Sequence, residues 1–226
     1  MLRHGLRVSV AILTFTIGIG VVWALGLIPR LETALVDHFF TVHGDIAAPT
    51  LINPTEEANQ IYRVLIQEKF EFEKTRLIVL SPVTTGCPFY EDETVKAKMG
   101  LAQSFHEWAK EMMPEAEAQT VDDYLAKNET SGRLPVANLG INYAIFNPSD
   151  FPKDEFYDFW TRFDQKYPHS SGLISFSNVG FNPKHNQAFV YGAYTCGGLC
   201  GSGTYFLLQK INGRWQIIME QGLWVS

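Results

Sequence analysis

Cysteine and basic residues are both scarce in this chain of 226 residues. The three cysteines are too few for a small domain that is held together by disulfides. Lysine and arginine number 18 against 24 acidic residues, and the net charge of −6 excludes the basic surface of a general nucleic-acid binder. With hydrophobic residues at 46% and aromatic residues at 13%, the chain is too apolar to be intrinsically disordered. Its length suits one domain or, as an alternative, two.

Charged side chains and histidine are absent from residues 8–29. As a helix, these 22 residues would extend about 33 Å, enough to cross a hydrocarbon core of about 30 Å. We therefore predict a membrane anchor over residues 1–30. Two alternatives stay open. One is a cleaved signal peptide, whose apolar region usually has only about 7–15 residues. The other is a buried helix of a soluble core, although no side of this stretch is polar.

The charges around this stretch predict its orientation. Arg3 and Arg7 precede it, whereas Arg30 after it is accompanied by Glu32 and Asp37. The excess of positive charge before the span favours a cytoplasmic N-terminus, with the bulk of the chain periplasmic or extracellular. Residues 31–226 contain 15 basic and 24 acidic residues, a net charge of −9. We expect this acidic part to be soluble and to have no attraction to anionic lipid.

Helical patterns dominate the chain after a tether over residues 31–52, and we expect a single α+β globular domain over residues 53–226. Short apolar runs predict strands at residues 77–80 and 141–146. We expect four helices. The first begins at Asn53, and the second extends over residues 92–113. The third begins at a capping box of Thr120 and Asp123 and ends near Asn128, and the fourth begins at Pro152. The first and last of these have apolar faces made of Ala58, Ile61, Tyr62, Leu65 and Ile66, and of Phe156, Phe159, Trp160, Phe163 and Tyr167.

From Gly172 onward, apolar residues alternate with polar ones, and this predicts strands. Asn212-Gly213 is a strong hairpin signal, because both residues tolerate positive φ. Short connections between strands predict antiparallel neighbours. The fold class expected is α+β: an N-terminal transmembrane helix, then helices packed on a C-terminal antiparallel β-meander. Its strands are expected at residues 173–179, 187–194, 204–210 and 215–225.

Four C-terminal segments resemble the end of a group of uncharacterised bacterial exported proteins: Val179-Gly180-Phe181-Asn182, Gln187-Ala188-Phe189-Val190-Tyr191, Cys196-Gly197-Gly198-Leu199-Cys200-Gly201 and Asn212-Gly213-Arg214-Trp215. The resemblance covers roughly the last fifty residues and implies export, but no chemistry. The order of helices followed by a meander is also similar to the cone-shaped fold of NTF2-like proteins (relatives of nuclear transport factor 2). That likeness implies a pocket between sheet and helices.

Cys196 and Cys200 form the most unusual motif of the chain. Their spacing, with glycines between them, lets the two Cβ atoms approach to the roughly 3.5–4.5 Å that a disulfide needs, and an oxidising compartment would favour the bond. We predict a structural disulfide that fixes a turn between two strands. Reduced thiols, a redox-active pair and metal ligation are the alternatives. The spacing is not Cys-x-x-Cys, and no second pair of Cys or His ligands lies nearby for a zinc site.

Cys87 is left over from this pair, and we expect it to be a buried, inert thiol. The alternatives are a nucleophile with His106 or His169 as its base, or a disulfide with Cys196 or Cys200. His106-Glu107 does not form a zinc-protease motif, because Lys110 occupies the place of the second histidine. Paired acids such as Asp122-Asp123 are expected to cap helices. The sequence therefore predicts no catalytic set, no cofactor and no metal site.

Three functions remain open. The favoured one is a membrane-tethered domain outside the cytoplasm with a non-catalytic role, in binding or in envelope structure. Its expected partners are the membrane, through the N-terminal helix, and an unidentified small molecule or protein, but no nucleic acid. The second is a hydrolase-like enzyme with a dispersed site that uses Cys87. The third is a thiol-redox protein that uses Cys196 and Cys200.

Overall fold

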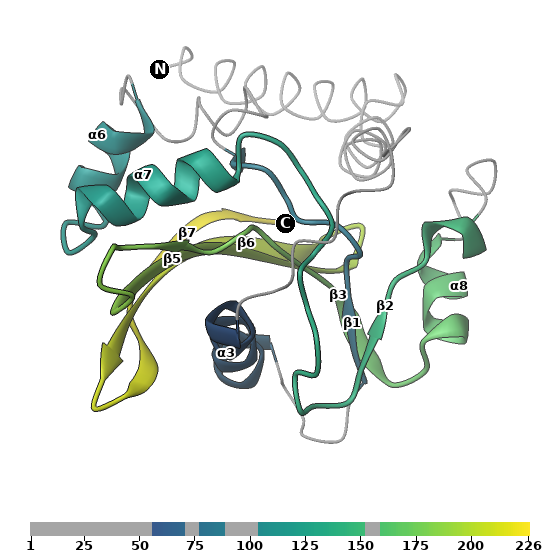
Figure 1. Cartoon of the computed structure of the whole chain (residues 1–226). Coiled ribbons are helices and arrows are strands. Elements are labelled where there is room, and N and C mark those ends of the chain that lie inside the picture. Colours follow the sequence, from purple (N-terminus) through teal and green to yellow (C-terminus); the bar gives the residue numbers. More distant parts are fainter. Residues whose placement is uncertain (1–55, 71–76, 89–103, 152–158) are drawn as a thin grey trace, which may run out of the picture. The chain divides into compact units, whose positions relative to one another are not determined.

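The computed structural model describes residues 56–70, 77–88, 104–151 and 159–226 (Figure 1). All of them belong to one compact unit, Pro49–Ser226. The predicted membrane anchor, the tether and the helix start at Asn53 lie outside the described residues and stay predictions. Among the helices that are described, none is both long and apolar enough to cross a membrane.

The described fold is α+β, as predicted, but its sheet is mixed rather than wholly antiparallel. The meander at its C-terminal side is confirmed: β3, β5, β6 and β7 are antiparallel neighbours. On the other side, β1 pairs in parallel with both β2 and β3. The chain passes through helices between β1 and β2, and again between β2 and β3, and such long crossovers permit parallel pairing. The sheet has the order β2 (Tyr143–Ile145), β1 (Leu77–Leu80), β3 (Ser170–Phe176), β5 (Gln187–Gly197), β6 (Cys200–Ile211), β7 (Arg214–Val225), and the short β4 (Gly180–Phe181) pairs with β5.

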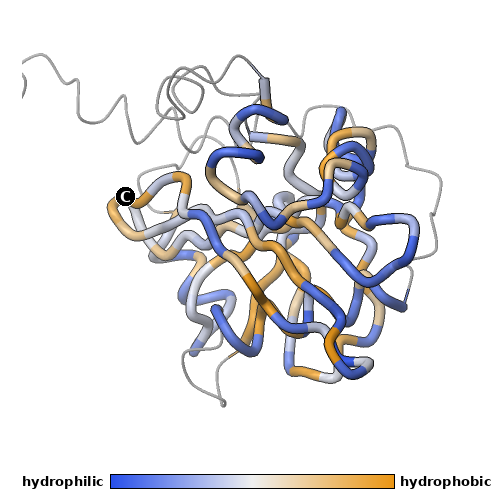
Figure 2. Tube along the Cα trace, turned by 90° about the vertical axis from the view of Figure 1, so that its left-hand side faces the viewer, coloured by the Kyte–Doolittle hydropathy of each residue, from blue (hydrophilic) through white to orange (hydrophobic). Residues whose placement is uncertain are grey.

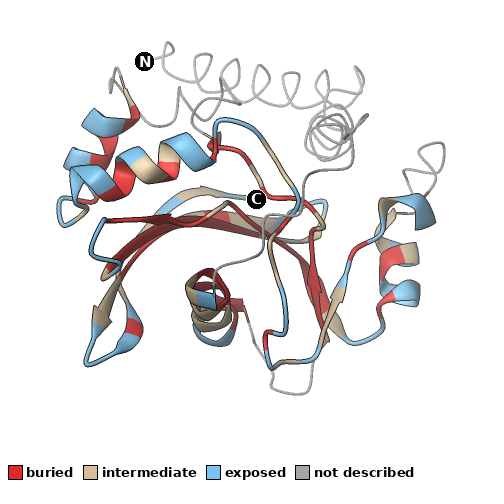
Figure 3. Ribbon diagram, viewed as in Figure 1, coloured by how far each residue is buried: buried red, intermediate tan, exposed pale blue. Residues whose placement is uncertain are grey.

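Helices cover both faces of this sheet (Figure 1). One face packs against α3 (Glu56–Leu65), and the other against α6 (Phe105–Met112) and α7 (Ala118–Lys127). The strands at the centre are therefore buried on both sides, which Figure 3 shows as continuous red. The first seven residues of β5 are buried without interruption, where a sheet covered on one face would alternate.

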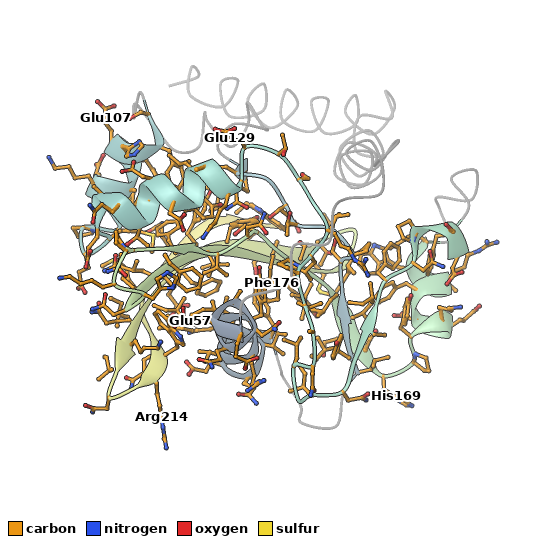
Figure 4. All side chains as sticks on the ribbon, in the orientation of Figure 1. Glu57, Glu107, Glu129, His169, Phe176 and Arg214 are labelled. Carbon is orange, nitrogen blue, oxygen red and sulfur yellow. A yellow bond between two sulfur atoms is a disulfide. The ribbon has the colours of Figure 1, made fainter. Side chains whose placement is uncertain are left out.

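The face of α3 was predicted correctly from its spacing. The five apolar residues expected on it are all buried, and they pack on the sheet together with Phe176, which lies between α3 and the strands (Figure 4). The ring of Tyr62 lies 5.0 Å from that of Phe176, and its hydroxyl donates a hydrogen bond to the carbonyl of Ser177 at 2.9 Å. A π-helical turn, η1 (Ile66–Phe70), extends the helix and adds Phe70 to the same core.

The helix expected over residues 92–113 is not one continuous helix. Its described part, α6, begins only at Phe105, because Ser104 is extended (φ −144°, ψ 159°) and its hydroxyl caps the helix by accepting from the N–H of Glu107 at 3.2 Å. Residues 92–103 lie outside the described part. The apolar spacing continues across Ser104, which hid the cap. At the other end the prediction is correct, since α6 ends at Met112.

The capping box predicted at Thr120 is also wrong, although the helix end near Asn128 is confirmed. The N-cap of α7 is Glu117, so Thr120 lies inside the helix. Its hydroxyl is buried and donates to Oε1 of Gln187 at 2.9 Å. The same Oε1 accepts from the N–H of Glu117 at 2.7 Å, so that a buried glutamine of β5 takes the place of a local cap. Asp122 and Asp123 likewise lie in the body of the helix instead of at its start.

The aromatic stripe of the fourth predicted helix is core in part: two of its five residues are buried, Phe159 and Trp160 are half-buried, and Phe156 lies outside the described residues. Helix α8 (Phe159–Lys166) buries Phe163 completely, and Tyr167 directly after it is also buried. Both rings pack against Phe146 and Phe151, which come from the chain after β2. The predicted start of this helix, at residues 152–158, lies outside the described residues.

The last strand of the sheet combines a regular hairpin with two bulges. Asn212 and Gly213 form the predicted turn, with φ of 52° and 77°. Farther along β7, the register with β6 skips Ile218 and then Leu223. Each bulge turns two consecutive side chains toward the core that α6 and α7 cover: Ile218 with Met219, and Leu223 with Trp224.

Candidate functional site at the disulfide end of the sheet

The predicted disulfide is present at the end of the β5–β6 hairpin. Cys196 lies at the end of β5 and Cys200 opens β6, and the bond joins them across a Cα–Cα distance of 5.1 Å. Gly197 to Leu199 make the tight connection. A bond across so few residues contributes about 2 kcal/mol through loop entropy, at the low end for disulfides, and it also fixes the shape of this turn.

Two other segments meet the hairpin at the same end of the sheet. The end of β7 reaches it, because Ser202 pairs with Val225 and the backbones of Gly201 and Ser226 exchange two hydrogen bonds of 3.0 and 3.3 Å. The start of β3 reaches it from the other side, since a Cβ at Gly172 would contact Cys196 and its neighbours. We call residues 170–172, 194–204 and 221–226 the uncharged sheet end.

No side chain of the uncharged sheet end is charged, although the whole chain has 42 charged side chains (18 basic and 24 acidic). Its two projecting side chains are Leu199 and Val225, which are 81% and 83% exposed. Among the other large hydrophobic residues that the structure describes, exposure reaches only 41%. Figure 2 shows this mainly white and orange region around the C-terminus. An exposed apolar region without charge is typical of a contact surface.

Trp224 anchors this end to the interior. Its indole Nε1–H donates to the hydroxyl of Tyr191 at 2.7 Å, and the ring crosses β6 above Gly201 and Gly203. A Cβ at Gly203 would overlap both Tyr191 Oη and Trp224 Nε1. The glycines of this segment therefore make room for the indole, a packing role in addition to the tight turn that the sequence predicts.

Cys87 lies in the buried aromatic cluster beneath Trp224. It is 1% exposed, forms no disulfide, and its Sγ is 3.8 Å from the hydroxyl of Tyr205. Burial raises the pKa of the phenols of Tyr124, Tyr191 and Tyr205, so these groups are neutral at ordinary pH. A buried thiol in such a cluster is in the environment of an inert core cysteine. The predicted alternative of a Cys87 disulfide with Cys196 or Cys200 is wrong, because those two pair with each other.

The histidines proposed as bases for Cys87 have other roles in the structure. His106 lies on the exposed side of α6, where its Nε2 is 2.7 Å from Asp122. His169 adopts a positive φ of 65° directly before β3, and its carbonyl accepts from the N–H of Leu77. Among the described residues, no group of three or more His, Cys, Asp and Glu side chains is arranged to hold a metal ion.

A polar cluster at the N-terminal end of α3 was missed by the sequence analysis. Glu57, in the first turn of α3, contacts His185 Nδ1 and Lys210 Nζ, each at 2.6 Å (Figure 4). The hydrogen bond from Lys210 is the main cause that lowers the pKa of Glu57, against the opposing effect of burial. His185 has a positive φ of 51° and stacks on Phe181, and Lys210 lies over the ring of Trp215. This cluster joins α3 to the turn between β4 and β5 and to the end of β6.

Comparison with protein-family models, with curated proteins and with solved structures finds no match to this chain. The resemblance of the C-terminal segments to bacterial exported proteins, and that of the topology to NTF2-like folds, therefore stay predictions. The function has to be argued from the site itself.

Proposed function

We propose that this protein is a membrane-tethered domain that works outside the cytoplasm, where it binds another molecule rather than transforming one. The observation that carries the proposal is the disulfide between Cys196 and Cys200, because such bonds form and persist in oxidising compartments and are rare in the cytosol. The uncharged stretch of residues 8–29 supplies the membrane anchor of the proposal, and Arg3 and Arg7 support its orientation.

The interior of the fold supports a non-catalytic role. The side chains of α3 that face the sheet include Ile61, Tyr62 and Leu65, and each is fully buried against strand residues. Phe105 and Tyr124 of α6 and α7 are equally buried on the opposite face. Protein atoms thus occupy these sheet–helix interfaces, where the NTF2-like resemblance would place a pocket. This arrangement favours recognition by an outer surface.

The two enzymatic alternatives find less support in the described residues. Cys87 is enclosed in the core, whereas a nucleophile needs access to its substrate. Cys200 opens a strand rather than a helix, so no helix N-terminus stabilises a thiolate there as it does in thiol-redox proteins. The uncharged sheet end, which presents exposed apolar side chains on a fixed hairpin, has the character of a binding surface.

Fractionation of cells that make the full chain tests this proposal. We expect the chain in the membrane pellet after extraction at alkaline pH, with residues 1–30 still present by mass spectrometry. Protease added to spheroplasts, which expose the outer side of the cytoplasmic membrane, should degrade residues after 30 while a cytosolic marker protein survives. An intact chain in the cytosol, or one protected from external protease until the membrane is lysed, would contradict the proposal.

A further inference from the structure

We propose that the uncharged sheet end rests on the bilayer to which the chain is tethered, with Leu199 and Val225 inserted among the lipid headgroups and upper acyl chains. This inference deepens the proposed function and rests on it for the presence of the tether. The molecule that this surface contacts is zwitterionic lipid, which has no net charge.

The two apolar side chains are held in place before any contact is made. The disulfide fixes the turn that carries Leu199, and the paired backbone hydrogen bonds between Gly201 and Ser226 fix the strand end that carries Val225. Because the two side chains are already ordered at one end of the sheet, insertion costs little conformational entropy. Each aliphatic side chain that leaves water raises the equilibrium constant for insertion by about ten- to a hundredfold.

The charge distribution selects the kind of lipid. Charged side chains are costly in the apolar part of a bilayer, and the 20 residues of the uncharged sheet end have none. The part of the chain after residue 30 has a net charge of −9, so an anionic surface repels it as a whole. Phosphatidylcholine-like headgroups present no net charge to this acidic domain, and the side chains of the sheet end bring none into the apolar region.

The length of chain between the predicted anchor and the described domain permits the contact. Twenty-six residues separate Pro29 from Glu56. Fully extended they reach about 90 Å, and as a flexible chain about 30 Å. A folded domain of this size has a radius of gyration of about 15 Å, so any end of it can turn to the bilayer. Tethering also makes the contact intramolecular, so two inserted side chains suffice.

The alternative, in which a partner protein adds a strand to the sheet at the edge of β7, has less support. Among the described strands, β7 pairs only with β6. However, the bulges at Ile218 and Leu223 interrupt its edge, and the charged Glu220 lies between them, in an ion pair with Lys69 at 2.9 Å. Bulges and charges of this kind oppose edge-to-edge pairing. The bilayer therefore explains the uncharged end better than a second protein strand.

Tryptophan quenching in liposomes tests the inference. The full chain is reconstituted in phosphatidylcholine, with and without bromine on the acyl chains, as the parent and as L199W. The matched control is M112W, which places the reporter at a partly exposed position of α6, outside the uncharged sheet end. We expect bromine to remove at least half of the emission that L199W adds to the parent. The emission that M112W adds should stay unchanged.

The parent and a W23F variant report separately on the anchor. If Trp23 is quenched but the reporter at residue 199 is not, the tether stands and this inference is overturned. If Trp23 is not quenched, the proposed function itself fails. Equal quenching at residues 199 and 112 would show a contact that is not confined to the sheet end, and this result would overturn the inference. A doubled mass in detergent, with the residue-199 reporter shielded from iodide, would assign the surface to a second copy and also overturn the inference.

Discussion

Two glycines of the sheet differ sharply in what surrounds them, and replacing each with alanine tests the packing described above. A Cβ at Gly180 would lie 2.5 Å from the backbone N and Cα of Tyr124, because the backbone of β4 lies directly against α7 there. A Cβ at Gly222 would have no neighbour within 4 Å. Neither residue needs a left-handed conformation, so the two substitutions differ only in the space around them.

The clash at Gly180 has to be relieved by moving α7, because the atoms it meets belong to the helix backbone. Overpacking of this kind costs about 1–3 kcal/mol. The shift would also lengthen the 2.7 Å hydrogen bond that the N–H of Phe181 donates to Asp123, at about 1–2 kcal/mol. We therefore expect G180A to lower the free energy of unfolding by about 2–5 kcal/mol. G222A should leave it unchanged or raise it by about 0.4–1 kcal/mol, because alanine restricts the unfolded chain.

Urea unfolding of the full chain in detergent, followed by far-ultraviolet circular dichroism, measures both changes. With a slope of about 2 kcal/mol per molar urea, the midpoint of G180A should fall by about 1–2.5 M relative to the parent. The midpoint of G222A should stay within about 0.5 M of it. Equal midpoints for the two variants would refute the close approach of β4 and α7.

Three further predictions concern other contacts of the fold. Q187L leaves the N–H of Glu117 and the buried hydroxyl near it without an acceptor, so the free energy of unfolding should fall by about 3 kcal/mol in the same assay; a loss below about 1 kcal/mol would contradict this. Replacing Cys196 and Cys200 together with serine should cost about 2 kcal/mol, and reduction of the parent should reproduce that loss. E57Q should cost about 1 kcal/mol at pH 7. Because the folded-state pKa of Glu57 lies below its usual 4.5, this difference should persist above pH 4.5 and disappear as the pH falls through the lower folded value; a difference that remains at pH 2 would contradict the ion pairs.

The parts of the fold that were predicted correctly depend on local patterns. Asn212-Gly213 fixes its hairpin because the two residues themselves supply the positive φ. The buried face of α3 follows from spacing within ten residues, and the disulfide from two cysteines only four residues apart. In each case the residues that decide the structure are close together in the sequence, so no tertiary contact was needed to predict it.

The parts that were missed depend on contacts between distant segments. The position of β1 between two parallel partners is decided by crossovers through whole helices. The cap of α7 comes from Gln187, 70 residues beyond Glu117, which no capping rule can anticipate. The contact of Glu57 with His185 spans 128 residues. The uncharged sheet end was equally hidden, because its three segments meet only after the strands pair.

Sequential alkylation tests the central claim of an oxidised, extracytoplasmic domain most directly. Cells that make the full chain are quenched in acid and denatured, thiols are blocked with one reagent, disulfides are reduced, and the released thiols take a second reagent. Mass spectrometry then identifies the reagent on each cysteine. The account predicts the first reagent on Cys87 and the second on both Cys196 and Cys200. The first reagent on all three cysteines would contradict it.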